Sequence, residues 1–306
     1  YELDDAIEAT GPLENTEHVR QIGIELCEAM SFLHDHEIVY RDLKPDNIMI
    51  TERDGTVTPV LIDFNTATGF DADGAADGAT TIVGPYKPRE VAEADRAEDR
   101  QGPWSDVYSV GKILMFLLKG SVPKKDGVDP RDFGADCEPY LGEIVERATR
   151  TAADERYPNA TVMKQVLEAK DPTPPPSATL TAMHTGESYT IYPGDTVGRR
   201  YAAGPTPSIA LADDGEYIST VQIGFEVDDD GTWHVRDRSL NGTYVQAGEG
   251  WQRVLSESGR ERLRDQGEDY TDREGNVPPT RYPLEDGDLI ALVHPSYGVA
   301  LRFEEA

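Results

Sequence analysis

The sequence has few cysteines and few basic residues, and both shortages narrow what the protein can do. Its two cysteines, Cys27 and Cys137, are too few and too isolated for a disulfide framework or a zinc site. Acidic residues number 58 against 29 basic ones, so there is no basic footprint to displace counterions from a nucleic acid. We therefore expect a cytoplasmic protein that does not bind nucleic acid.

Long apolar runs are also missing. The longest is Ile113–Leu118, only six residues, whereas a helix needs about 20 apolar residues to span a bilayer. The sequence therefore predicts no membrane partner.

The formal charge of −29 comes from acidic residues spread along the whole chain. Such a surface repels itself, and salt screens that repulsion. An extreme halophile is accordingly the expected source, and intrinsic disorder is disfavoured because apolar periodicity persists almost throughout.

Apolar residues in the first 170 positions recur mainly at helical spacing. Asn15 has the character of an N-cap, and Val19, Ile22 and Leu26 continue a long amphipathic helix behind it. Further elements are predicted as helices over Ser105–Lys119, Tyr140–Arg150 and Asn159–Ala169, and as short extended segments near Ile38–Val39, Ile48–Ile50 and Val60–Ile62. Residues 1–170 are therefore expected to form a mainly α domain.

A proline-rich segment separates this domain from a second one. Asp171–Ser177 holds four prolines in seven residues, which is typical of a stiff, extended linker. Beyond it the apolar period changes to two, which predicts an all-β sandwich over residues 178–306. The polar stretch Ser256–Thr280 is expected to be a long surface loop inserted in that sandwich. The predicted fold class is a multidomain protein, mainly α and then all-β.

Four polar residues near two predicted strands have the spacing of a phosphoryl-transfer site. His36–Ile50 reads HEIVYRDLKPDNIMI and contains Asp42, Lys44 and Asn47, and Asp63 follows sixteen residues after Asn47. Transfer from ATP needs Mg²⁺, a carboxylate that orients the attacking hydroxyl, and a cation on the moving phosphoryl group. Mg²⁺ prefers oxygen ligands, which Asn47 and Asp63 supply if a hairpin joins their strands. The alternative is that these residues only bond their own backbone in turns.

This pattern resembles the eukaryotic-type Ser/Thr protein kinases. The family pattern H-R-D-L-K-P-x-N reads here as Tyr40–Asn47, and D-F-G reads as Asp63–Asn65. The resemblance implies that Asp42 is the catalytic base and Lys44 steadies the γ-phosphate of ATP. It also implies that Asn47 and Asp63 hold Mg²⁺.

The resemblance extends to residues that brace the site. It implies that Met49 lies under the adenine of ATP and that Arg41 meets an ordered or phosphorylated activation segment. It further implies that Glu90, which ends that segment, pairs with Arg156, and that Asp106 binds the catalytic-loop backbone. The fold implied for residues 1–170 is the C-terminal lobe of a protein kinase, acting on Ser or Thr of protein substrates.

The sequence departs from the kinase pattern at three positions. Tyr40 replaces the usual His, Asn65 replaces the D-F-G Gly, and Val83 stands where the family often keeps a Thr that hydrogen-bonds the catalytic Asp and Lys. Two threonines, Thr80 and Thr81, lie in the expected activation segment. We hypothesise that one of them is an activating phosphosite; the alternative is a flexible loop with incidental threonines.

The other half of a kinase site is not found in these 306 residues. The chain begins at the short helix after the hinge, with no Gly-rich phosphate loop and no strand Lys or helix Glu to clamp the α- and β-phosphates. It also starts with Tyr rather than Met, so we expect a piece of a longer product. The expected behaviour is an inactive fragment of an active kinase; the alternative is a pseudokinase or scaffold.

Residues of the second domain resemble a forkhead-associated (FHA) domain over roughly 178–305. The family pattern G-R, S-R-x-H, N-G-T appears as Gly198-Arg199, Ile218-Ser219 and Asn241-Gly242-Thr243, with the stretch WHVRD at Trp233–Asp237. The resemblance implies a phosphothreonine-peptide reader in which Arg199 and Ser219 bind phosphate and Asn241 holds the ligand's backbone.

The match to that family fails at three positions. Thr220 stands for the second Arg, Gln222 for the structural His, and Leu240 for a Thr that often contacts phosphate. Arg200 is a possible substitute for the second Arg, and the sequence leaves this open. Asn241-Gly242 alone is also an ordinary hairpin turn.

Overall fold

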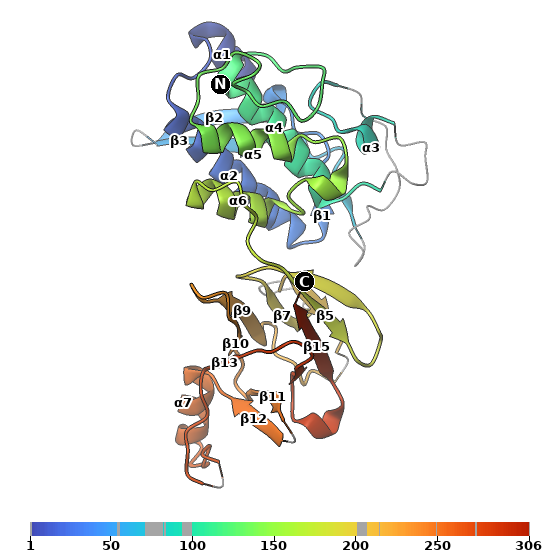
Figure 1. The fold of residues 1–306 in the computed structure, drawn as a ribbon, viewed down its shortest axis with the longest axis vertical. Helices are drawn as coiled ribbons and strands as arrows, with labels where there is room; N and C mark the ends of the chain where they lie inside the picture. The colour runs from blue at the N-terminus through green and yellow to red at the C-terminus, as the bar shows by residue number, and fades with distance from the viewer. Residues whose placement is uncertain are drawn as a thin grey trace. The chain divides into compact units, whose positions relative to one another are not determined.

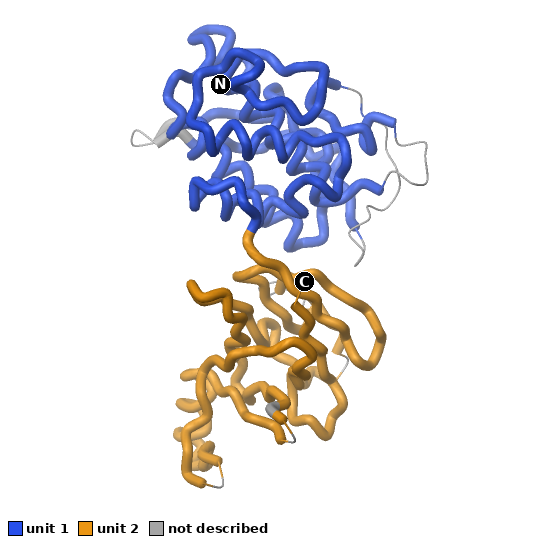
Figure 2. Tube along the Cα trace, viewed as in Figure 1, with its two compact units in different colours: residues 1–174 blue, residues 175–306 orange. Residues whose placement is uncertain are grey.

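A computed structural model describes residues 2–53, 56–70, 82, 84–93, 100–200, 207–213, 215–248, 250–272 and 274–305. The chain divides into two compact units, residues 1–174 and residues 175–306 (Figure 2). The division falls inside the proline-rich segment Asp171–Ser177. Each unit is described by itself below.

The first unit is built on the long helix α2, Thr16–His34. Its N-cap is Asn15, whose side chain accepts hydrogen bonds from the backbone amides of Glu17 and His18. Before it lies α1, Leu3–Thr10, which ends at Gly11 with a positive φ of 81°. The N-cap that the sequence predicts at Asn15 is therefore confirmed.

The helix α4, Pro103–Lys119, lies at the centre of this unit. Nearly all of its side chains are buried, and it ends at Gly120 in the left-handed conformation with φ 71°. It packs against α2 and α5 (Pro139–Ala148), while α2 also packs against α6 (Ala160–Ala169), as Figure 1 shows. Among the described residues, none of the helices has both the length and the apolar character that crossing a bilayer requires.

Short strands carry the polar motif along one side of the helices. The 3₁₀ turn η1 (Pro45–Asn47) leads into β2 (Ile48–Arg53), which pairs antiparallel with β3 (Thr56–Leu61) and places Ile48 opposite Leu61. A second small pair joins β1 (Ile38–Val39) to β4 (Thr68–Gly69). The remaining elements of this unit are the short helix α3 (Arg89–Ala92) and the 3₁₀ turn η2 (Ala153–Glu155). The segments before β2 and after β3 therefore emerge side by side.

The second unit is a sandwich of two sheets, as the period of two predicts. One sheet has the strand order β13-β10-β9-β7-β8 and the other β12-β11-β14-β15-β5-β6. All paired strands run antiparallel except β7 and β8, which are parallel. The strands are β5 (Ala178–Ala182), β6 (Ser188–Ile191), β7 (Thr196–Arg199), β8 (Ile209–Leu211), β9 (Ile223–Val227), β10 (Trp233–Asp237), β11 (Thr243–Ala247), β12 (Gly250–Val254), β13 (Arg281–Pro283), β14 (Leu289–Ala291) and β15 (Ala300–Glu305).

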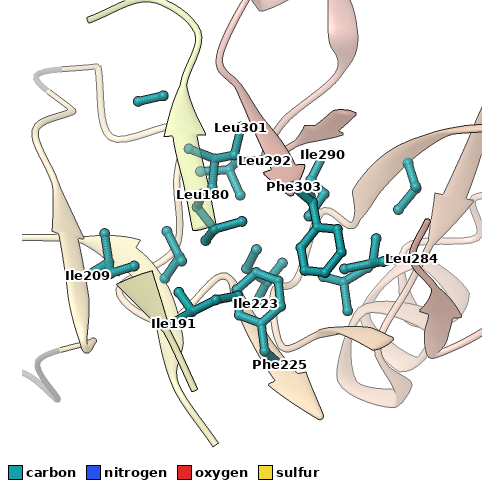
Figure 3. Packing of buried hydrophobic residues seen from close by; sticks show 14 of the residues in the cluster. Leu180, Ile191, Ile209, Ile223, Phe225, Leu284, Ile290, Leu292, Leu301 and Phe303 are labelled. Atoms are coloured by element: carbon teal, nitrogen blue, oxygen red, sulfur yellow. The ribbon is translucent and has the colours of Figure 1, made fainter. Parts of the chain in front are cut away.

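The inward-facing residues of both sheets form one apolar core. Figure 3 shows Phe225 of one sheet and Leu180 and Phe303 of the other converging on the interior, where all three are almost fully buried. Trp233 joins them, with its ring centroid 5.8 Å from that of Phe303. Because each fully buried large apolar side chain stabilises a fold by roughly 1.5–3 kcal/mol, this core is the main support of the loops at the sandwich ends.

The expectation of a loop throughout Ser256–Thr280 is wrong. A nine-residue helix, α7 (Glu257–Asp265), begins there with Ser256 as its N-cap, whose hydroxyl accepts a hydrogen bond from the Gly259 amide at 3.0 Å. Leu263 is its one buried large apolar residue, so the helical period is almost invisible in the sequence. A further 3₁₀ turn, η3 (Pro295–Tyr297), precedes the last strand.

Candidate functional sites

The structure brings Asp42 and Asn47 together at the start of β2. The Asn47 amide nitrogen Nδ2 donates to the Asp42 backbone carbonyl at 2.8 Å and to its carboxylate oxygen Oδ2 at 3.0 Å. Asn47 itself is buried at the end of η1. Because both bonds use the amide nitrogen, the amide oxygen Oδ1 is left available as a ligand for a hard cation.

Asp63 lies next to Asn47 through the backbone. The amide of Ile62 donates to the carbonyl of Asn47 at 3.0 Å, extending the pairing of β2 and β3 by one bond. Asp63 is the next residue, exposed, with a positive φ of 63°, a conformation that Asp adopts more readily than most residues. A carboxylate and an amide oxygen so placed are the donor types that Mg²⁺ prefers, so these residues fit that ion.

A lysine that the sequence analysis did not single out occupies the other side of Asp42. Lys87 Nζ lies 2.7 Å from Asp42 Oδ1 and also donates to the Leu43 carbonyl at 3.2 Å. Burial lowers the pKa of Lys87, while the neighbouring Asp42 raises it. Lys44, predicted to act at this site, has its side chain 38 % exposed, and its nearest carboxylate contact is Asp46 at 3.9 Å.

Asp106 fixes the backbone immediately before Asp42. Its carboxylate accepts hydrogen bonds from the amide of Tyr40 at 2.9 Å and that of Arg41 at 2.8 Å, and lies 3.0 Å from His34 Nε2. Arg41 has a positive φ of 66°, so this turn is one that an L-residue rarely adopts unaided. The buried carboxylate at the start of α4 therefore holds the bend that presents Asp42.

Tyr40 joins the loop to the strand that carries Asp63. Its hydroxyl donates to the carbonyl of Ile62 at 2.5 Å, and its ring meets that of Phe64 edge-on, with centroids 5.2 Å apart. Burial raises the pKa of this hydroxyl, so it remains a donor at neutral pH. Tyr40 thus connects the segments holding Asp42 and Asp63 although it departs from the family pattern.

Arg41 is held by groups on two further segments. Its guanidinium donates to the Thr66 carbonyl at 2.6 and 2.9 Å and to the Gln101 side-chain oxygen at 3.0 Å. Gln101 in turn donates to the backbone carbonyl of Glu90 at 3.0 Å. Thr80, Thr81 and Val83 lie outside the described residues, so the predicted meeting of Arg41 with a phosphothreonine stays a prediction.

Glu90 and Arg156 form the predicted pair. Arg156 Nη1 lies 2.6 Å from Glu90 Oε1 and Nη2 lies 3.3 Å from Oε2, and both side chains are buried. Ser105 donates to the same Glu90 oxygen at 3.0 Å. Glu90, at the end of the predicted activation segment, is therefore held both by Arg156 and by Ser105 at the beginning of α4.

Met49 stands in β2 opposite Val60, half-buried, and forms an isolated bridge with Glu2 beside α1. Its place under an adenine stays a prediction.

In the second unit the structure brings Arg199 and Ser219 together. The Arg199 amide donates to the Ser219 carbonyl at 2.9 Å, so the end of β7 lies against the loop before β9. The Arg199 guanidinium is 2.8 Å from Glu216 Oε1. The positive charge of Arg199 is thus paired with the Glu216 carboxylate, and a phosphate contact for Arg199 and Ser219 stays a prediction.

Gln222 links the two loops that the resemblance assigns to ligand binding. Its side-chain oxygen accepts from the Ser219 amide at 2.9 Å, and its nitrogen donates to the Gly242 carbonyl at 3.2 Å and to Thr243 Oγ1 at 3.1 Å. Buried in this position, Gln222 provides the bracing expected of the family's His.

Two arginines missed by the sequence analysis hold Asn241. Arg262 of α7 donates to the Asn241 side-chain oxygen, and Arg253 of β12 donates to its carbonyl at 2.8 Å. No signal could have identified Arg262, because its helix was predicted as a loop. Arg200 lies beside Arg199, and its amide donates to the Leu211 carbonyl at 3.1 Å; a phosphate contact for its side chain stays a prediction.

Comparison with known proteins agrees with both resemblances. The family model described as "Protein kinase domain" matches residues 1–178, and the model described as "FHA domain" matches residues 196–268. The chain is 31% identical over 163 residues to the serine/threonine-protein kinase PknA of Nostoc sp. and 30% identical over 162 residues to the serine/threonine-protein kinase C of Synechocystis sp.. It is also 29% identical over 182 residues to the serine/threonine-protein kinase PknB of Mycolicibacterium smegmatis.

These alignments cover 49% of this chain with the first two relatives and 54% with the third. They cover only 28–29% of the relatives' own lengths. The kinase family model matches more than half of the residues of this chain, so the chain belongs to the protein kinase family. An FHA domain follows its kinase domain.

Proposed function

We propose that the protein from which this chain comes transfers the γ-phosphate of ATP to Ser or Thr hydroxyls of proteins. The observation that carries the proposal is the double hydrogen bond from Asn47 to Asp42, next to the strand end that presents Asp63. It places a candidate base and two candidate metal ligands within one small region, as phosphoryl transfer requires.

Each residue has a distinct role in the proposed reaction. The carboxylate of Asp42 orients the substrate hydroxyl and accepts its proton, while Asn47 and Asp63 would hold Mg²⁺ through oxygen atoms. When bound, Mg²⁺ neutralises the charge on the phosphate oxygens of ATP. Lys44 steadies the γ-phosphate, for which its half-exposed ammonium must turn from Asp46, and Met49 supports the adenine.

We propose further that the kinase domain in this chain consists of the C-terminal lobe and does not complete the reaction by itself. Phe64, next to Asp63, is 49 % exposed, and Val60 on β3 is also exposed, so apolar surface borders the site. Exposed large apolar groups beside a site are typical of a surface that another domain covers. The phosphate clamp and the adenine pocket would then come from that domain.

The test is phosphotransfer from γ-labelled ATP in high-salt buffer with Mg²⁺, using this chain and the longer gene product side by side. We expect label transfer by the longer protein and none by the 306-residue chain. Transfer by the short chain that is lost in Asp42→Asn would refute the fragment proposal. An inactive longer protein that contains a second lobe would refute the kinase proposal.

For the second unit we propose binding of phosphothreonine-containing peptides. The contact of Arg199 with the Ser219 loop, and the bracing of that loop by Gln222, support it. Arg199 and Ser219 would bind the phosphate, and Asn241 would hold the peptide backbone. Titration with matched phosphorylated and unmodified peptides tests this binding. Equal affinities for the two peptides would refute the proposal that the domain recognises phosphothreonine.

A scaffold without catalysis is the second candidate. The contact of Lys87 with Asp42 Oδ1 favours it, because a buried cation already occupies one oxygen of the candidate base. In this case the kinase domain packs against partners while the FHA domain reads phosphorylated chains. The phosphotransfer assay above separates the two candidates.

A cytoplasmic location and a halophilic source also belong to the proposal. Cys27 and Cys137 are both free thiols, which suits a reducing compartment. The excess of acidic residues suits high salt. Fluorescence microscopy of the tagged gene product tests the location.

A further inference from the structure

We propose that Lys87 is the residue that positions the catalytic base Asp42, from within the segment that ends at Glu90. This inference rests on the proposed kinase function and assigns a task that the kinase pattern does not give to the position of Lys87. The family's Thr for this task is replaced by Val83, four residues earlier in the same segment.

The contact has the geometry of a built ion pair. Lys87 Nζ lies 2.7 Å from Asp42 Oδ1, and the Lys87 side chain is only 2 % exposed. The same ammonium donates to the carbonyl of Leu43, the next residue of the catalytic loop, at 3.2 Å. Lys87 therefore binds both the side chain of the base and the backbone that carries it.

The backbone around Lys87 is fixed independently of Asp42. The Lys87 amide donates to the Gly84 carbonyl at 3.2 Å, which closes a turn. Ser109 of the buried helix α4 donates to the carbonyl of Tyr86 at 2.9 Å. Because its own backbone is fixed by these bonds, Lys87 can determine the position of the Asp42 side chain.

The ion pair leaves Asp42 able to act. Lys87 occupies one position on Oδ1 and Asn47 one on Oδ2, whereas a carboxylate offers about four lone-pair positions. The Asp42 side chain is 15 % exposed, so a substrate hydroxyl can reach it. Lys87 thus orients the base without covering it.

Lys112 provides a matched control on α4. Its Nζ lies 3.3 Å from Asp126 Oδ1, its side chain is also 2 % exposed, and burial likewise lowers its pKa. Lys112 also donates to a backbone carbonyl, that of Pro123, at 3.3 Å. It shares the burial and chemistry of Lys87 but contacts no residue assigned to the reaction.

The first experiment compares Lys87→Met, Lys87→Arg and Lys112→Met in the longer gene product. Loss of general-base positioning costs about 10²-fold, so Lys87→Met should lower kcat by that order with the KM for ATP unchanged. Lys87→Arg should restore at least tenfold of the loss, and Lys112→Met should keep the wild-type kcat. Equal losses in both Met variants would show a purely structural role, and a higher kcat in Lys87→Met would show an inhibitory latch; either result overturns the proposal.

The pH dependence of kcat/KM distinguishes the proposed positioning role of Lys87 from a purely structural one. Asp42 and Asp106 raise the pKa of Lys87 and Lys44 lowers it, but burial dominates, so Lys87 loses its proton below its usual pKa of 10.5. The kcat/KM of wild type should therefore fall at alkaline pH. Lys87→Arg, whose guanidinium stays charged, should keep its activity there. An identical alkaline limb in the two proteins would overturn the proposal.

A third measurement tests the ion pair of Lys87 and Asp42 even if the longer protein has no kinase activity. NMR titration of the Lys87 side chain in the 306-residue chain reports the pair directly. In Asp42→Asn the pKa of Lys87 should fall further, because burial remains while the opposing charge is gone. The pKa of Lys112 should not change. An unchanged Lys87 titration would show that the pair does not form, which overturns the proposal whatever the function.

Discussion

Several charged side chains of the first unit are buried together with groups that compensate their charge. Arg156 and Glu90 meet through two hydrogen bonds, and Asp106 receives two backbone amides and contacts His34. Breaking such a pair leaves an uncompensated buried charge, which costs far more than losing a surface pair. These residues should therefore be sensitive to substitution even though none of them reacts.

We predict that Arg156→Met lowers the free energy of unfolding of the first unit by about 3–5 kcal/mol, because Glu90 is left buried without its partner. Arg89→Met is the control, since Arg89 pairs with Glu93 at the surface at 3.2 Å. That variant should unfold with almost the wild-type midpoint in urea. Equal midpoints for the two variants would contradict the role of the buried pair.

In the second unit, Asp237 makes stability depend on pH. Burial raises its pKa above the usual 3.8, although hydrogen bonds from Ser256, Thr243 and Ser239 oppose the rise. Between 3.8 and the raised pKa the folded state binds more protons than the unfolded state. Its contribution to stability is therefore complete below pH 3.8 and is lost as the pH rises through the folded-state pKa.

Asp237→Asn removes this titration. As the pH rises above 3.8, the melting temperature of the wild type should fall relative to that of the variant and then level off. Thermal melts followed at the Trp233 indole resonance measure this difference, since Trp233 lies on the same strand, β10. A difference that stays constant across the range would show that Asp237 does not titrate as described.

At the scale of residues, the sequence predicts the site only where a pattern fixes the spacing. Asp42, Asn47 and Asp63 flank the hairpin of β2 and β3, and a short hairpin necessarily brings its two ends together. Their roles in a reaction stay a proposal. Lys87 and Arg262 were missed because their contacts depend on how a distant segment folds back. No local sequence pattern predicts that such a segment folds back onto the site.

At the scale of elements, the helices are predictable where their ends carry caps. Asn15 precedes an apolar run of period 3.6, so α2 begins where the sequence indicates. The helix α7 has an N-cap in Ser256 but buries only Leu263 among its large apolar residues, so its period is too weak to read. The helix depends on tertiary contacts, which cannot be read from the local sequence.

The cap of α2 gives a direct test. Asn15→Ala should lower the free energy of unfolding of the first unit by about 1 kcal/mol, because the amides of Glu17 and His18 lose their acceptor. Asn15→Ser, which keeps an acceptor, should recover most of this loss. If both variants unfold at the same urea concentration, the cap contributes nothing.

The contact between α7 and Asn241 predicts an effect on peptide binding. If Asn241 holds the ligand's backbone, Arg262→Ala should weaken binding of a phosphothreonine peptide about fivefold, because it removes a bond that orients Asn241. Arg264→Ala is the control on the same helix, since Arg264 contacts Tyr270 instead. Isothermal titration of both variants measures this, and equal affinities would contradict the positioning of Asn241 by α7.

At the scale of the whole molecule, the net charge of −29 should govern stability in salt. In one-to-one pairs, the 29 basic residues can neutralise at most half of the 58 acidic ones, so repulsion opposes the folded state at low ionic strength. Raising salt from about 0.1 to 1 M shortens the screening length from roughly 10 to 3 Å. Melting temperatures should therefore rise steeply with KCl, and a flat response would contradict the halophilic assignment.

The division into two domains was accessible from the sequence, because the apolar period changes across a proline-rich segment. The kinase and FHA families were indicated by the motif resemblances, with which the family models agree. The activity proposed above is that of the longer gene product, and the alignments with the relatives cover under a third of their length. The central claim of the proposed function is that the carboxylate of Asp42 acts as the general base in that longer protein.

The most direct test is label transfer from γ-labelled ATP by the longer gene product carrying either Asp42→Asn or Asp46→Asn. Asp46 is the matched control, an exposed carboxylate four residues away whose ion-pair contact is with Lys44 at 3.9 Å. Asp46→Asn should transfer at nearly the wild-type rate, and Asp42→Asn at least about 10²-fold more slowly. Wild-type transfer by Asp42→Asn would contradict the proposed chemistry of this site.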